Sequence, residues 1–387
     1  MTLLYVGNLM SVHVQRWLRF FVGQGHEVHL LTPPAEGIPA PDIHVHMWRS
    51  VRTRLRPFDY AANTVLLAPR VLQFRALVRR IQPDLVHAHY LNDAAFIAAL
   101  AGARPLVVTA WGSDVLINPR ESTVLRAMVS LILRKADLVT CDAAHVKRAL
   151  VALGADASKV ALIYFGTDTT LFHPAKRDPA LREQLGLDNA PAVVSVRSLE
   201  PVYDVATLIA AFPAVLARCP SARLVIAGTG SEQAKLREAA RSLRIDHAVR
   251  FVGWVQEQEL PRLLASCDVY VSTALSDGGI AASTAEAMAC ALPVIVTDVG
   301  DNREWVQDGV HGFLVPARDP AALAARIVSL LELRDDRVRL GRNARTLIEE
   351  RNNWTTEMSR MAKVYRDLAS RARKPEKVER AGGARGA

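Results

Sequence analysis

The residues with the clearest chemical potential lie in the segment from Asp277 to Gly300. An apolar strand is followed there by Asp277, Gly278 and Gly279, and the sequence predicts that a helix begins near Ile280. The first backbone N–H groups of a helix have no partner inside the helix, and glycines leave them uncovered. This arrangement can therefore seat a phosphate.

Glu286 lies about one and a half turns into the same predicted helix. A carboxylate at this position can accept hydrogen bonds from the vicinal hydroxyls of a ribose. Taken alone, the segment is more typical of a Gly-Gly turn followed by a solvated helix residue. The interpretation as a nucleotide site therefore depends on the rest of the chain.

Two histidines, His87 and His89, alternate onto one face of a predicted strand. His89 lies nearer the carboxyl end of that strand, where parallel sheets bind their ligands, so it is the better placed to reach a substrate. The alternative is a core histidine that is satisfied by the backbone.

Around these residues the chain alternates between short apolar strands and amphipathic helices, such as 12–22 and 123–134. This alternation is typical of parallel sheets that are covered on both faces. Strands are predicted at 3–6, 28–31, 85–89, 106–109, 138–141 and 160–163, and then at 192–196, 224–227, 249–251, 269–272, 293–296 and 313–315. The predicted fold class is α/β, with two doubly wound, Rossmann-like domains that face a central cleft.

A charged stretch with several prolines after Gly166 interrupts the alternation. We therefore predict an amino-terminal domain at residues 1–168, a linker at 169–190 and a carboxyl-terminal domain at 191–352. A helix at 353–372 is expected to pack back on the amino-terminal domain. The tail at 373–387, rich in Arg, Lys and Gly, is expected to be disordered.

The composition fits this organisation. A length of 387 residues suggests about two domains, and 50% hydrophobic residues can fill both cores. Four scattered cysteines without a C-x-x-C pair indicate reduced core residues, not a metal site. No basic region precedes the first apolar run, and no apolar stretch reaches the roughly 20 residues that span a bilayer. The sequence predicts no signal peptide and a cytoplasmic protein.

The net charge of +9 is densest in residues 48–80, which contain eight arginines, from Arg49 to Arg80, and one acid. Basic residues interleaved with Trp48 and Phe58 suit an anionic membrane surface or a lipid diphosphate. The alternative is a solvated helix face. Nucleic acid is not expected as a partner, because no recognised motif accompanies the charge.

An ordered series of motifs resembles the family 4 glycosyltransferases, which have the GT-B fold. YVGNLMSVHVQRWLRFFVGQGHEVHLLT resembles the first strand, glycine loop and helix of the acceptor domain, and DLVHAHY and PLVVTAWGSD resemble its cleft-lining strands. YFGTDTTLFHP resembles the interdomain segment, VVSVRSLEP the phosphate-binding strand end, LVIAGTGSE the next strand and turn, and FVGWV the base-binding edge. With the segment 277–300, which resembles the donor signature, these motifs cover most of residues 3–316 in the expected order.

The resemblance implies roles for the donor-binding residues. Glu286 matches the second of the family's paired glutamates, which holds the ribose. The first of the pair falls at Gly278 in this chain, so the neighbouring Asp277 becomes the candidate for contacting the donor sugar. The remaining donor-binding candidates are Gly228, Gly230, Trp254, Val255, Gly278, Gly279, Ile280 and Ala281.

Arg197 matches the arginine that neutralises the donor diphosphate, a role suited to its planar, bidentate donor. The alternative is a surface arginine in a salt bridge. The family's second cation, a lysine, is missing, since its positions are occupied by Val202 and Tyr203. Helix amides after Gly279 or a basic residue such as Arg303 are the candidates to replace it.

In the amino-terminal domain the resemblance assigns the glycine loop to Gly7 and Asn8, although any parallel-sheet protein has a loop there. Where the family often has an active-site histidine, this chain has Trp111. Asp114 and the Trp111 ring, together with His89, are therefore the candidates for contacting the donor sugar or the acceptor.

The resemblance implies that a hexose-type unit is transferred, with retention, from a UDP- or GDP-sugar to a lipid-linked, polysaccharide or other glycan acceptor. Such a site works by electrostatic stabilisation and positioning, and the leaving phosphate takes the acceptor's proton. No Asp-x-Asp motif is present, and neither a cofactor nor a metal is expected. We expect an enzyme peripheral to the inner face of the cytoplasmic membrane.

Three alternatives share this scaffold: a nucleotide-sugar epimerase, a sugar-phosphate synthase and a catalytically inactive nucleotide-sugar-binding subunit. A nicotinamide dehydrogenase is disfavoured, because the first strand leads into GNLMSVH instead of G-x-G-x-x-G.

Overall fold

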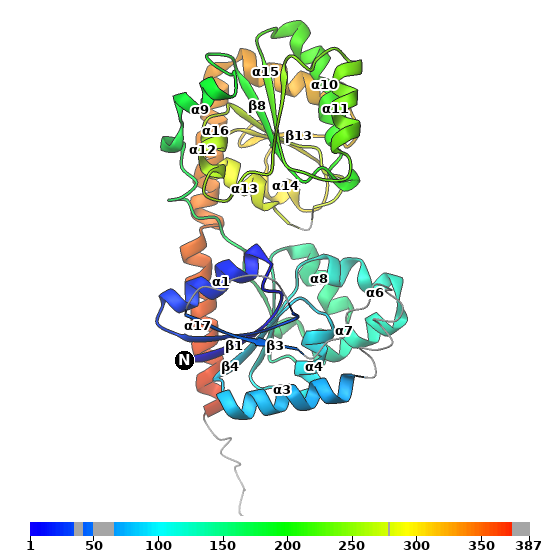
Figure 1. Ribbon diagram of the computed structural model, residues 1–387, viewed down its shortest axis with the longest axis vertical. Coiled ribbons are helices and arrows are strands. Elements are labelled where there is room, and N and C mark those ends of the chain that lie inside the picture. Colours follow the sequence, from blue (N-terminus) through cyan, green and yellow to red (C-terminus); the bar gives the residue numbers. More distant parts are fainter. Residues whose placement is uncertain (35–41, 49–65, 278, 374–387) are drawn as a thin grey trace, which may run out of the picture. The chain divides into compact units, whose positions relative to one another are not determined.

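The computed structural model describes residues 1–34, 42–48, 66–277 and 279–373. These residues form two compact units, each built around one parallel sheet (Figure 1). Unit 1 comprises residues 1–141, 146–163 and the chain from Met358 onward, and unit 2 comprises residues 142–145 and 164–357. The predicted class, α/β with two doubly wound domains, is confirmed.

Unit 1 contains a sheet of seven strands in the order β3-β2-β1-β4-β5-β6-β7, all parallel. The strands are β1 (Thr2–Val6), β2 (Glu27–Thr32), β3 (Ile43–Met47), β4 (Leu85–His89), β5 (Leu106–Thr109), β6 (Leu138–Cys141) and β7 (Val160–Leu162). The helices associated with it are α1 (Val12–Gly23), α3 (Leu67–Ile81), α4 (Asp93–Ala101), α5 (Ser113–Leu116), α6 (Asn118–Glu121), α7 (Thr123–Lys135) and α8 (Ala144–Ala152). Strand β3 was not predicted, because its five residues alternate between apolar residues and histidines and lack the continuous apolar run of most other strands.

The last helix, α17 (Trp354–Arg373), belongs to unit 1 from Met358 onward. Its Tyr365 is fully buried and lies within hydrogen-bonding distance of the imidazole Nδ1 of His87. The hydroxyl of Tyr5 also donates to that of Tyr365 over 3.2 Å. Because buried polar groups need partners, these hydrogen bonds fix the register of α17 on the sheet.

Unit 2 contains a parallel sheet of six strands in the order β10-β9-β8-β11-β12-β13. The strands are β8 (Ala192–Val196), β9 (Arg223–Ala227), β10 (Val249–Gly253), β11 (Val269–Ser272), β12 (Val294–Thr297) and β13 (Gly312–Val315). The helices are α9 (Pro179–Gln184), α10 (Val205–Arg218), α11 (Gln233–Ser242), α12 (Leu260–Ala265), α13 (Ala282–Ala289), α14 (Asn302–Trp305), α15 (Pro320–Glu332) and α16 (Arg334–Arg351).

Both faces of the second sheet are buried. Val193 packs into a core cluster with residues of α10 and α15, whereas its neighbour Val194 packs into another with residues of α12, α13 and α16. Successive side chains of a strand point to opposite faces, so a strand covered on both sides must be apolar throughout. This explains why these strands were visible in the sequence as short apolar runs.

The predicted linker at 169–190 is instead part of unit 2. Phe172 and Leu187 are 1% and 0% exposed and belong to its core, and the buried Arg182 donates to the carbonyl of Ser266 over 2.6 Å. Prolines and charged residues interrupt the apolar residues of this stretch, so they give no long periodic pattern, which is why the segment was interpreted as a linker. The predicted disordered tail, apart from Arg373, lies outside the described residues.

The basic segment 48–80 is only partly described, because residues 49–65 fall outside the described ranges. Trp48 is 3% exposed and packs near the ring of Phe74, so it does not belong to a surface aromatic patch. Arg70 is 5% exposed, donates to Asp93 over 2.9 Å and lies over the Trp48 ring. These two residues are core residues, contrary to the expectation of a solvent-facing cluster.

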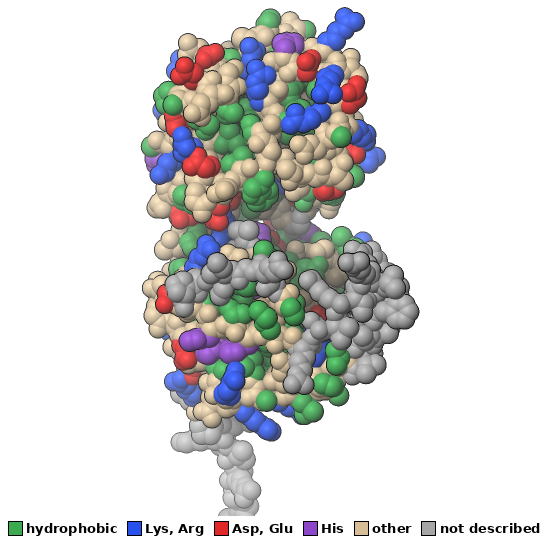
Figure 2. Space-filling model, viewed as in Figure 1, with side chains coloured by type: hydrophobic (Ala, Val, Ile, Leu, Met, Phe, Trp, Pro, Cys, Tyr) green, Lys and Arg blue, Asp and Glu red, His purple; other side chains and the backbone are tan. Residues whose placement is uncertain are grey.

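In the described part of this segment, the exposed basic residues lie on α3. Arg75, Arg79 and Arg80 are exposed there, and Leu72 is 64% exposed beside them. On the face shown in Figure 2, Lys and Arg side chains are spread over both units. In the described part of the chain, no helix is long and apolar enough to cross a membrane.

Candidate donor and acceptor sites

Each sheet has one place where the strand order reverses, and parallel sheets bind ligands in the crevice at that place. In unit 2 the reversal lies between β8 and β11. Arg197 follows β8 directly, and the loop after β11 carries Asp277. In unit 1 the reversal lies between β1 and β4, where Gly7 follows β1 and His89 ends β4. The fold thus places these predicted residues where such sheets bind ligands.

In unit 2 the two principal candidates contact each other. Arg197 Nη2 donates to Asp277 Oδ1 over 2.7 Å, and their side chains are 8% and 7% exposed. Burial acts to lower the pKa of Arg197, but Tyr270 and Asp277 outweigh it and raise this pKa above its usual value. The guanidinium therefore stays charged, and it is held in a buried ion pair instead of the surface salt bridge that was the alternative.

Tyr203 occupies one of the two positions where the family's lysine was expected. Its ring lies under the guanidinium of Arg197, with 4.4 Å between the Cζ atom and the ring centroid. The attraction between a cation and an aromatic face helps to hold Arg197 in place. Tyr203 therefore orients the one cation but does not supply the second positive charge of the missing lysine. Sequence comparison registered only the missing lysine and did not identify Tyr203 as part of the site.

Arg303, proposed from sequence as a replacement cation, lies on the short helix α14 and is largely exposed. Its Nε donates to Asp298 Oδ1 over 2.5 Å, so its charge is compensated by that neighbour. Among the described residues, Arg197 is therefore the basic side chain that contacts Asp277, and Arg303 is paired elsewhere.

Three glycines bring other backbone segments against Arg197, Asp277 and Leu199. A Cβ atom at Gly228 would meet the carbonyl oxygen of Arg197 at 2.2 Å, and one at Gly300 would meet that of Asp277 at 2.1 Å. At Gly230 the carbonyl oxygen of Leu199 would lie at 2.3 Å. The first and last residues of the segment 277–300 are thus packed against each other, which explains why a glycine stands at 300.

Helix α13 begins at Ala282, two residues later than predicted, and Ile280 and Ala281 form its approach. Ala281 provides no capping side chain, so the N-cap leaves the first N–H groups of the helix without a side-chain acceptor. Glu286 is 6% exposed on this helix. Gly279 precedes the helix, and Gly278 lies outside the described residues.

The predicted base-binding residues follow strand β10. Trp254 is 70% exposed, which is unusual for so large an apolar ring, whereas Val255 packs against the core of unit 2. An exposed ring beside a buried anchor suits stacking on a nucleobase.

In unit 1 the side chain of His89 is 3% exposed, and both its ring nitrogens lack hydrogen-bond partners among the described residues. Burial, followed by the charge of His13, lowers its pKa to about 3. A Cβ atom at Gly7 would meet that of His89 at 3.4 Å, so the glycine loop lies directly against this histidine. Asn8 accepts a hydrogen bond from the amide of Met10 over 2.9 Å and shapes the same loop.

His87, by contrast, is fully engaged. Its Nε2 lies 2.7 Å from the hydroxyl of Thr109, and its Nδ1 faces Tyr365. Burial, then the charge of His89, lowers its pKa well below the usual value. His87 is thus a core histidine, whereas its neighbour His89 has unused hydrogen-bonding capacity at the end of the strand.

Asp114 is 0% exposed, and its oxygens accept hydrogen bonds from the amides of Leu91 at 2.9 Å and Trp111 at 3.0 Å. Burial raises its pKa, although the backbone donors oppose this shift. The prediction that Asp114 contacts the sugar does not fit this burial: the carboxylate holds the loop that carries Trp111. The ring of His13, which the sequence did not single out, lies 4.9 Å from the Trp111 ring.

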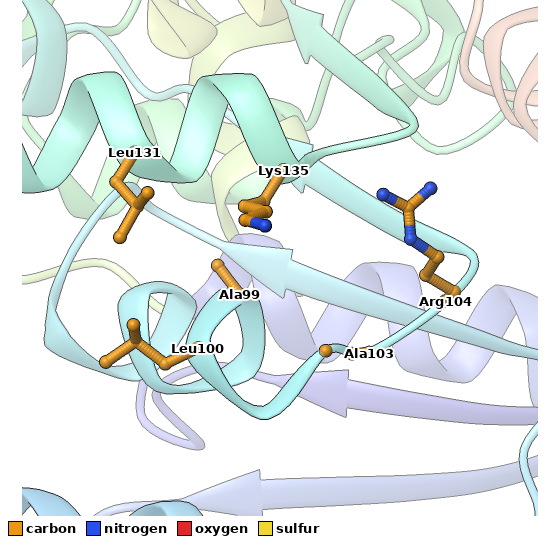
Figure 3. A pocket seen from close by; sticks show the side chains of 7 residues that line it. Ala99, Leu100, Ala103, Arg104, Leu131 and Lys135 are labelled. Atoms are coloured by element: carbon orange, nitrogen blue, oxygen red, sulfur yellow. The ribbon is translucent and has the colours of Figure 1, made fainter.

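A separate cavity of about 240 Å³ lies near the amino-terminal ends of β5 and β6 (Figure 3). Lys135 and Arg104 line it together with apolar residues of α4 and α7, and Arg104 is paired with Asp137 over 2.8 Å. The candidate residues lie at the opposite, carboxyl ends of the strands, so this cavity is not part of the site.

The fold and the reversal-point residues together define a protein of the GT-B type. The solved structure of Alr3699/HepE from Anabaena in complex with UDP superposes with a TM-score of 0.79 at 23% identity, covering 95% of this chain and 100% of that one. Sucrose-phosphate synthase from Thermosynechococcus elongatus gives a TM-score of 0.78 at 21% identity, covering 96% and 100%. At these identities the likeness establishes the fold.

Sequence relationships give the family. A family model described as "Glycosyl transferase 4-like" matches residues 2–143, and one described as "Glycosyl transferases group 1" matches residues 178–347. Phosphatidyl-myo-inositol mannosyltransferase of Mycolicibacterium smegmatis is 28% identical over 94% of this chain and 91% of its own length. N-acetyl-alpha-D-glucosaminyl L-malate synthase of Bacillus anthracis is 24% identical over 89% and 90%. The chain belongs to the family 4 glycosyltransferases, and it is a hexosyltransferase.

Proposed function

We propose that this enzyme transfers a hexose unit, with retention of anomeric configuration, from a UDP- or GDP-sugar to a lipid-linked or glycan acceptor. The observation that carries the proposal is the buried Arg197–Asp277 pair at the reversal point of unit 2, in the loop that leads to α13 and Glu286. The UDP complex of HepE supports the donor class, and the phosphatidyl-myo-inositol mannosyltransferase supports a lipid acceptor.

The donor side follows from the chemistry of each group. Arg197 donates two hydrogen bonds to diphosphate oxygens, Glu286 accepts from the ribose hydroxyls, and Trp254 stacks on the base. Asp277 then exchanges its ion pair for hydrogen bonds from hydroxyls of the donor sugar. This exchange leaves the full charge of Arg197 to the diphosphate.

In the reaction, the bond between the anomeric carbon and the diphosphate oxygen breaks, and a bond from that carbon to the acceptor oxygen forms on the same face. The acceptor's proton moves to the departing phosphate oxygen. The charge that develops there is stabilised by Arg197 and by the first N–H groups of α13. No metal or cofactor takes part in this scheme.

Unit 1 supplies the acceptor side of the proposal. His89 is neutral at physiological pH, so it offers one N–H donor and one nitrogen acceptor to a sugar hydroxyl. Asp114 acts through the loop that it holds, and it is therefore a positioning residue. The exposed arginines of α3 support a peripheral enzyme at the inner face of the cytoplasmic membrane.

Nucleotide binding and mutation test the donor assignment. Calorimetry with UDP and GDP identifies the base, and steady-state kinetics follow with the sugars of the base that binds. We expect Arg197→Ala and Glu286→Ala each to reduce donor binding or turnover at least tenfold, which corresponds to about 1.4 kcal/mol. Arg334→Ala, at an exposed position on α16, is the control. Wild-type kinetics in both site variants would exclude the assignment.

Product analysis separates the transferase from its rivals. An epimerase alters UDP- or GDP-sugars without an acceptor, whereas the proposed enzyme needs one for transfer. A sugar-phosphate synthase, which the fold of sucrose-phosphate synthase makes a second candidate, accepts soluble sugar phosphates. NMR of the product formed with phosphoinositide, oligosaccharide and sugar-phosphate acceptors then gives both the acceptor and the anomeric configuration.

A further inference from the structure

Strands β2 and β3, at one edge of the unit 1 sheet, carry a cluster of histidines that the donor chemistry does not use. The two strands are parallel, and His29 pairs directly with His44. Glu27 lies two residues before His29, and so it projects from the same face of β2. A ligand atom from each of these three side chains lies within 4.8 Å of the other two.

The three groups are also oriented toward one another. His29 Nε2 lies 3.2 Å from Glu27 Oε1, and the rings of His29 and His44 are stacked with centroids 4.8 Å apart. The other oxygen of Glu27 accepts a hydrogen bond of 2.8 Å from the hydroxyl of Thr2. Figure 2 shows histidine side chains gathered in one patch on the surface of unit 1.

We propose that Glu27, His29 and His44 form a binding site for a divalent transition-metal ion of the Zn²⁺ class. Two imidazoles and one carboxylate are the donor set that zinc, nickel and copper prefer over the hard cations magnesium and calcium. Three protein ligands leave at least one coordination position open, which water or a further ligand occupies.

The side chains can reach coordination distance without moving the sheet. Metal–nitrogen and metal–oxygen bonds of about 2.0–2.2 Å bring ligand atoms to roughly 3.3 Å from one another, closer than the present upper limit. His29 is 8% exposed and fixed, whereas Glu27 and His44 are exposed and already contact it, so that small side-chain rotations bring their ligand atoms to the ion. The fixed imidazole provides the anchor, and the two surface side chains close around the ion.

His46 supports the anchor from outside the ligand set. Its Nε2 lies 3.0 Å from His29 Nδ1. A metal on Nε2 of His29 displaces the proton that this nitrogen directs at Glu27, and the ring proton then lies on Nδ1, from which it is donated to Nε2 of His46, an outer contact typical of metal-bound histidines. His46 then carries its own proton on Nδ1, so Arg80, which lies against that nitrogen, turns away when the metal binds. Arg80 Nη2 lies 3.4 Å from His46 Nδ1, so its positive charge opposes the incoming cation.

Glu27 and His44 lie on different strands, and an ion held by both would tie the edge strand β3 to β2. Metal binding should therefore stabilise unit 1, because a ligand that binds only the folded state adds its binding free energy to the stability. This site is independent of the donor chemistry in unit 2, and its test needs no glycosyl transfer.

The test is a Zn²⁺ titration of the full chain, free of any affinity tag and treated with a chelator beforehand. We expect one ion per chain by calorimetry and a rise in the melting temperature with Zn²⁺. Glu27→Gln and His44→Gln, at exposed positions, should each weaken binding at least tenfold and remove the thermal shift. His247→Gln changes an exposed histidine of unit 2 and serves as the matched control.

Two further measurements distinguish a built site from scattered imidazoles. Co²⁺ bound at this site should give visible absorption bands that disappear in His44→Gln, and Arg80→Gln should tighten Zn²⁺ binding. The proposal is overturned if Glu27→Gln and His44→Gln bind Zn²⁺ as tightly as the wild type, if the wild type binds none, or if His247→Gln loses as much affinity as His44→Gln.

Discussion

At the scale of single residues, the proposed donor site contains a positive charge, on Arg197, that is paired with an acid of the same protein. Arg197 and Asp277 compensate each other in a nearly dry environment. Removing one member of a buried pair leaves the other uncompensated, whereas a ligand can replace that member. A diphosphate replaces Asp277 as the partner of Arg197 only if Asp277 gains hydrogen bonds elsewhere. Under the proposed function, the pair therefore couples diphosphate binding to recognition of the sugar.

Asp277→Asn tests this coupling. The variant keeps the shape of the side chain but removes its charge, so Arg197 is fully available to a nucleoside diphosphate and loses a competitor. We expect UDP or GDP, whichever the wild type binds, to bind at least as tightly as before. Turnover of the sugar donor should fall at least tenfold, because an amide accepts hydroxyl hydrogen bonds less strongly than a carboxylate.

Isothermal calorimetry and steady-state kinetics on the same preparation give both quantities. If turnover rises together with diphosphate affinity, Asp277 only shields Arg197 and does not contact the sugar. Asp298→Asn, which releases the exposed Arg303 instead, is the control and should leave both quantities unchanged.

The lowered pKa of His89 leads to a prediction about how the stability of the protein depends on pH. Its folded-state pKa of about 3 lies below the unfolded value of 6.5, so below pH 6.5 the unfolded chain takes up a proton that the folded chain does not. Its contribution to stability is complete above pH 6.5 and is lost as the pH falls toward 3. By pH 5.5 the loss amounts to about 1.4 kcal/mol.

We expect His89→Phe to flatten the decline of the melting temperature between pH 7 and pH 5, as measured by differential scanning fluorimetry. His247→Gln, at an exposed site, should decline in parallel with the wild type. Parallel curves for His89→Phe and the wild type would show that His89 titrates normally in the folded protein.

Residue types were predictable from sequence where a motif fixes them, and residue environments were not. Arg197 and Asp277 were both singled out, but their contact depends on a loop geometry that spacing does not encode. Tyr203 entered the sequence argument only as an absent lysine. Asp114 was a candidate for substrate contact because an acid in a loop looks available, whereas backbone amides from two segments enclose it.

At the scale of elements, close backbone contacts shape the donor loop. Gly300 has φ +56° and its α-carbon faces the carbonyl of Asp277, so any side chain there meets a backbone atom. Gly309 also has a left-handed φ, of +72°, but a Cβ atom there would meet nothing within 4 Å. Substitution of either glycine therefore carries the same kind of conformational cost, but only at Gly300 does a new side chain also meet the backbone of Asp277.

Gly300→Ala should therefore displace the Asp277 loop and weaken donor binding at least tenfold. Gly309→Ala carries a similar conformational cost of about 1–2 kcal/mol but should bind the donor within twofold of the wild type. Melting temperatures report the shared cost, and calorimetry with the donor reports the difference. Equal donor affinities in the two variants would contradict a role for the Gly300 contact.

Elements buried on both faces were predicted closely, because a doubly covered strand must be apolar along its whole length. Edge strand β3 was not predicted, because its alternation of apolar residues with His44 and His46 spans only five residues and lacks the continuous apolar run of a strand buried on both faces. Helix α9 and the core residue Phe172 lie in a stretch that was interpreted as a linker. In both cases tertiary burial, which a local window does not see, decides the structure.

At the scale of the whole molecule, the net charge of +9 predicted an anionic partner but not the surface that would bind it. Arg70 belongs to the core of unit 1, and the exposed part of the described basic segment is one face of α3. On that face Arg75 and Arg79 stand four residues apart beside the exposed Leu72. An apolar side chain flanked by arginines suits the headgroup region of an anionic bilayer.

We therefore expect the enzyme to float with phosphatidylserine liposomes at low salt and to be released as the salt concentration rises. Each arginine near such a surface contributes about 1 kcal/mol, so Arg75→Gln with Arg79→Gln should lower the membrane partition coefficient roughly 30-fold. The matched control is Arg334→Gln with Arg342→Gln, which removes the same charge from exposed positions on α16 of unit 2. If attraction depends on net charge alone, both double variants detach equally. If only the α3 variant detaches, that helix is the contact with the membrane. If the wild-type protein stays in solution at low salt, the membrane is removed from the proposal, and a soluble glycan is left as the acceptor.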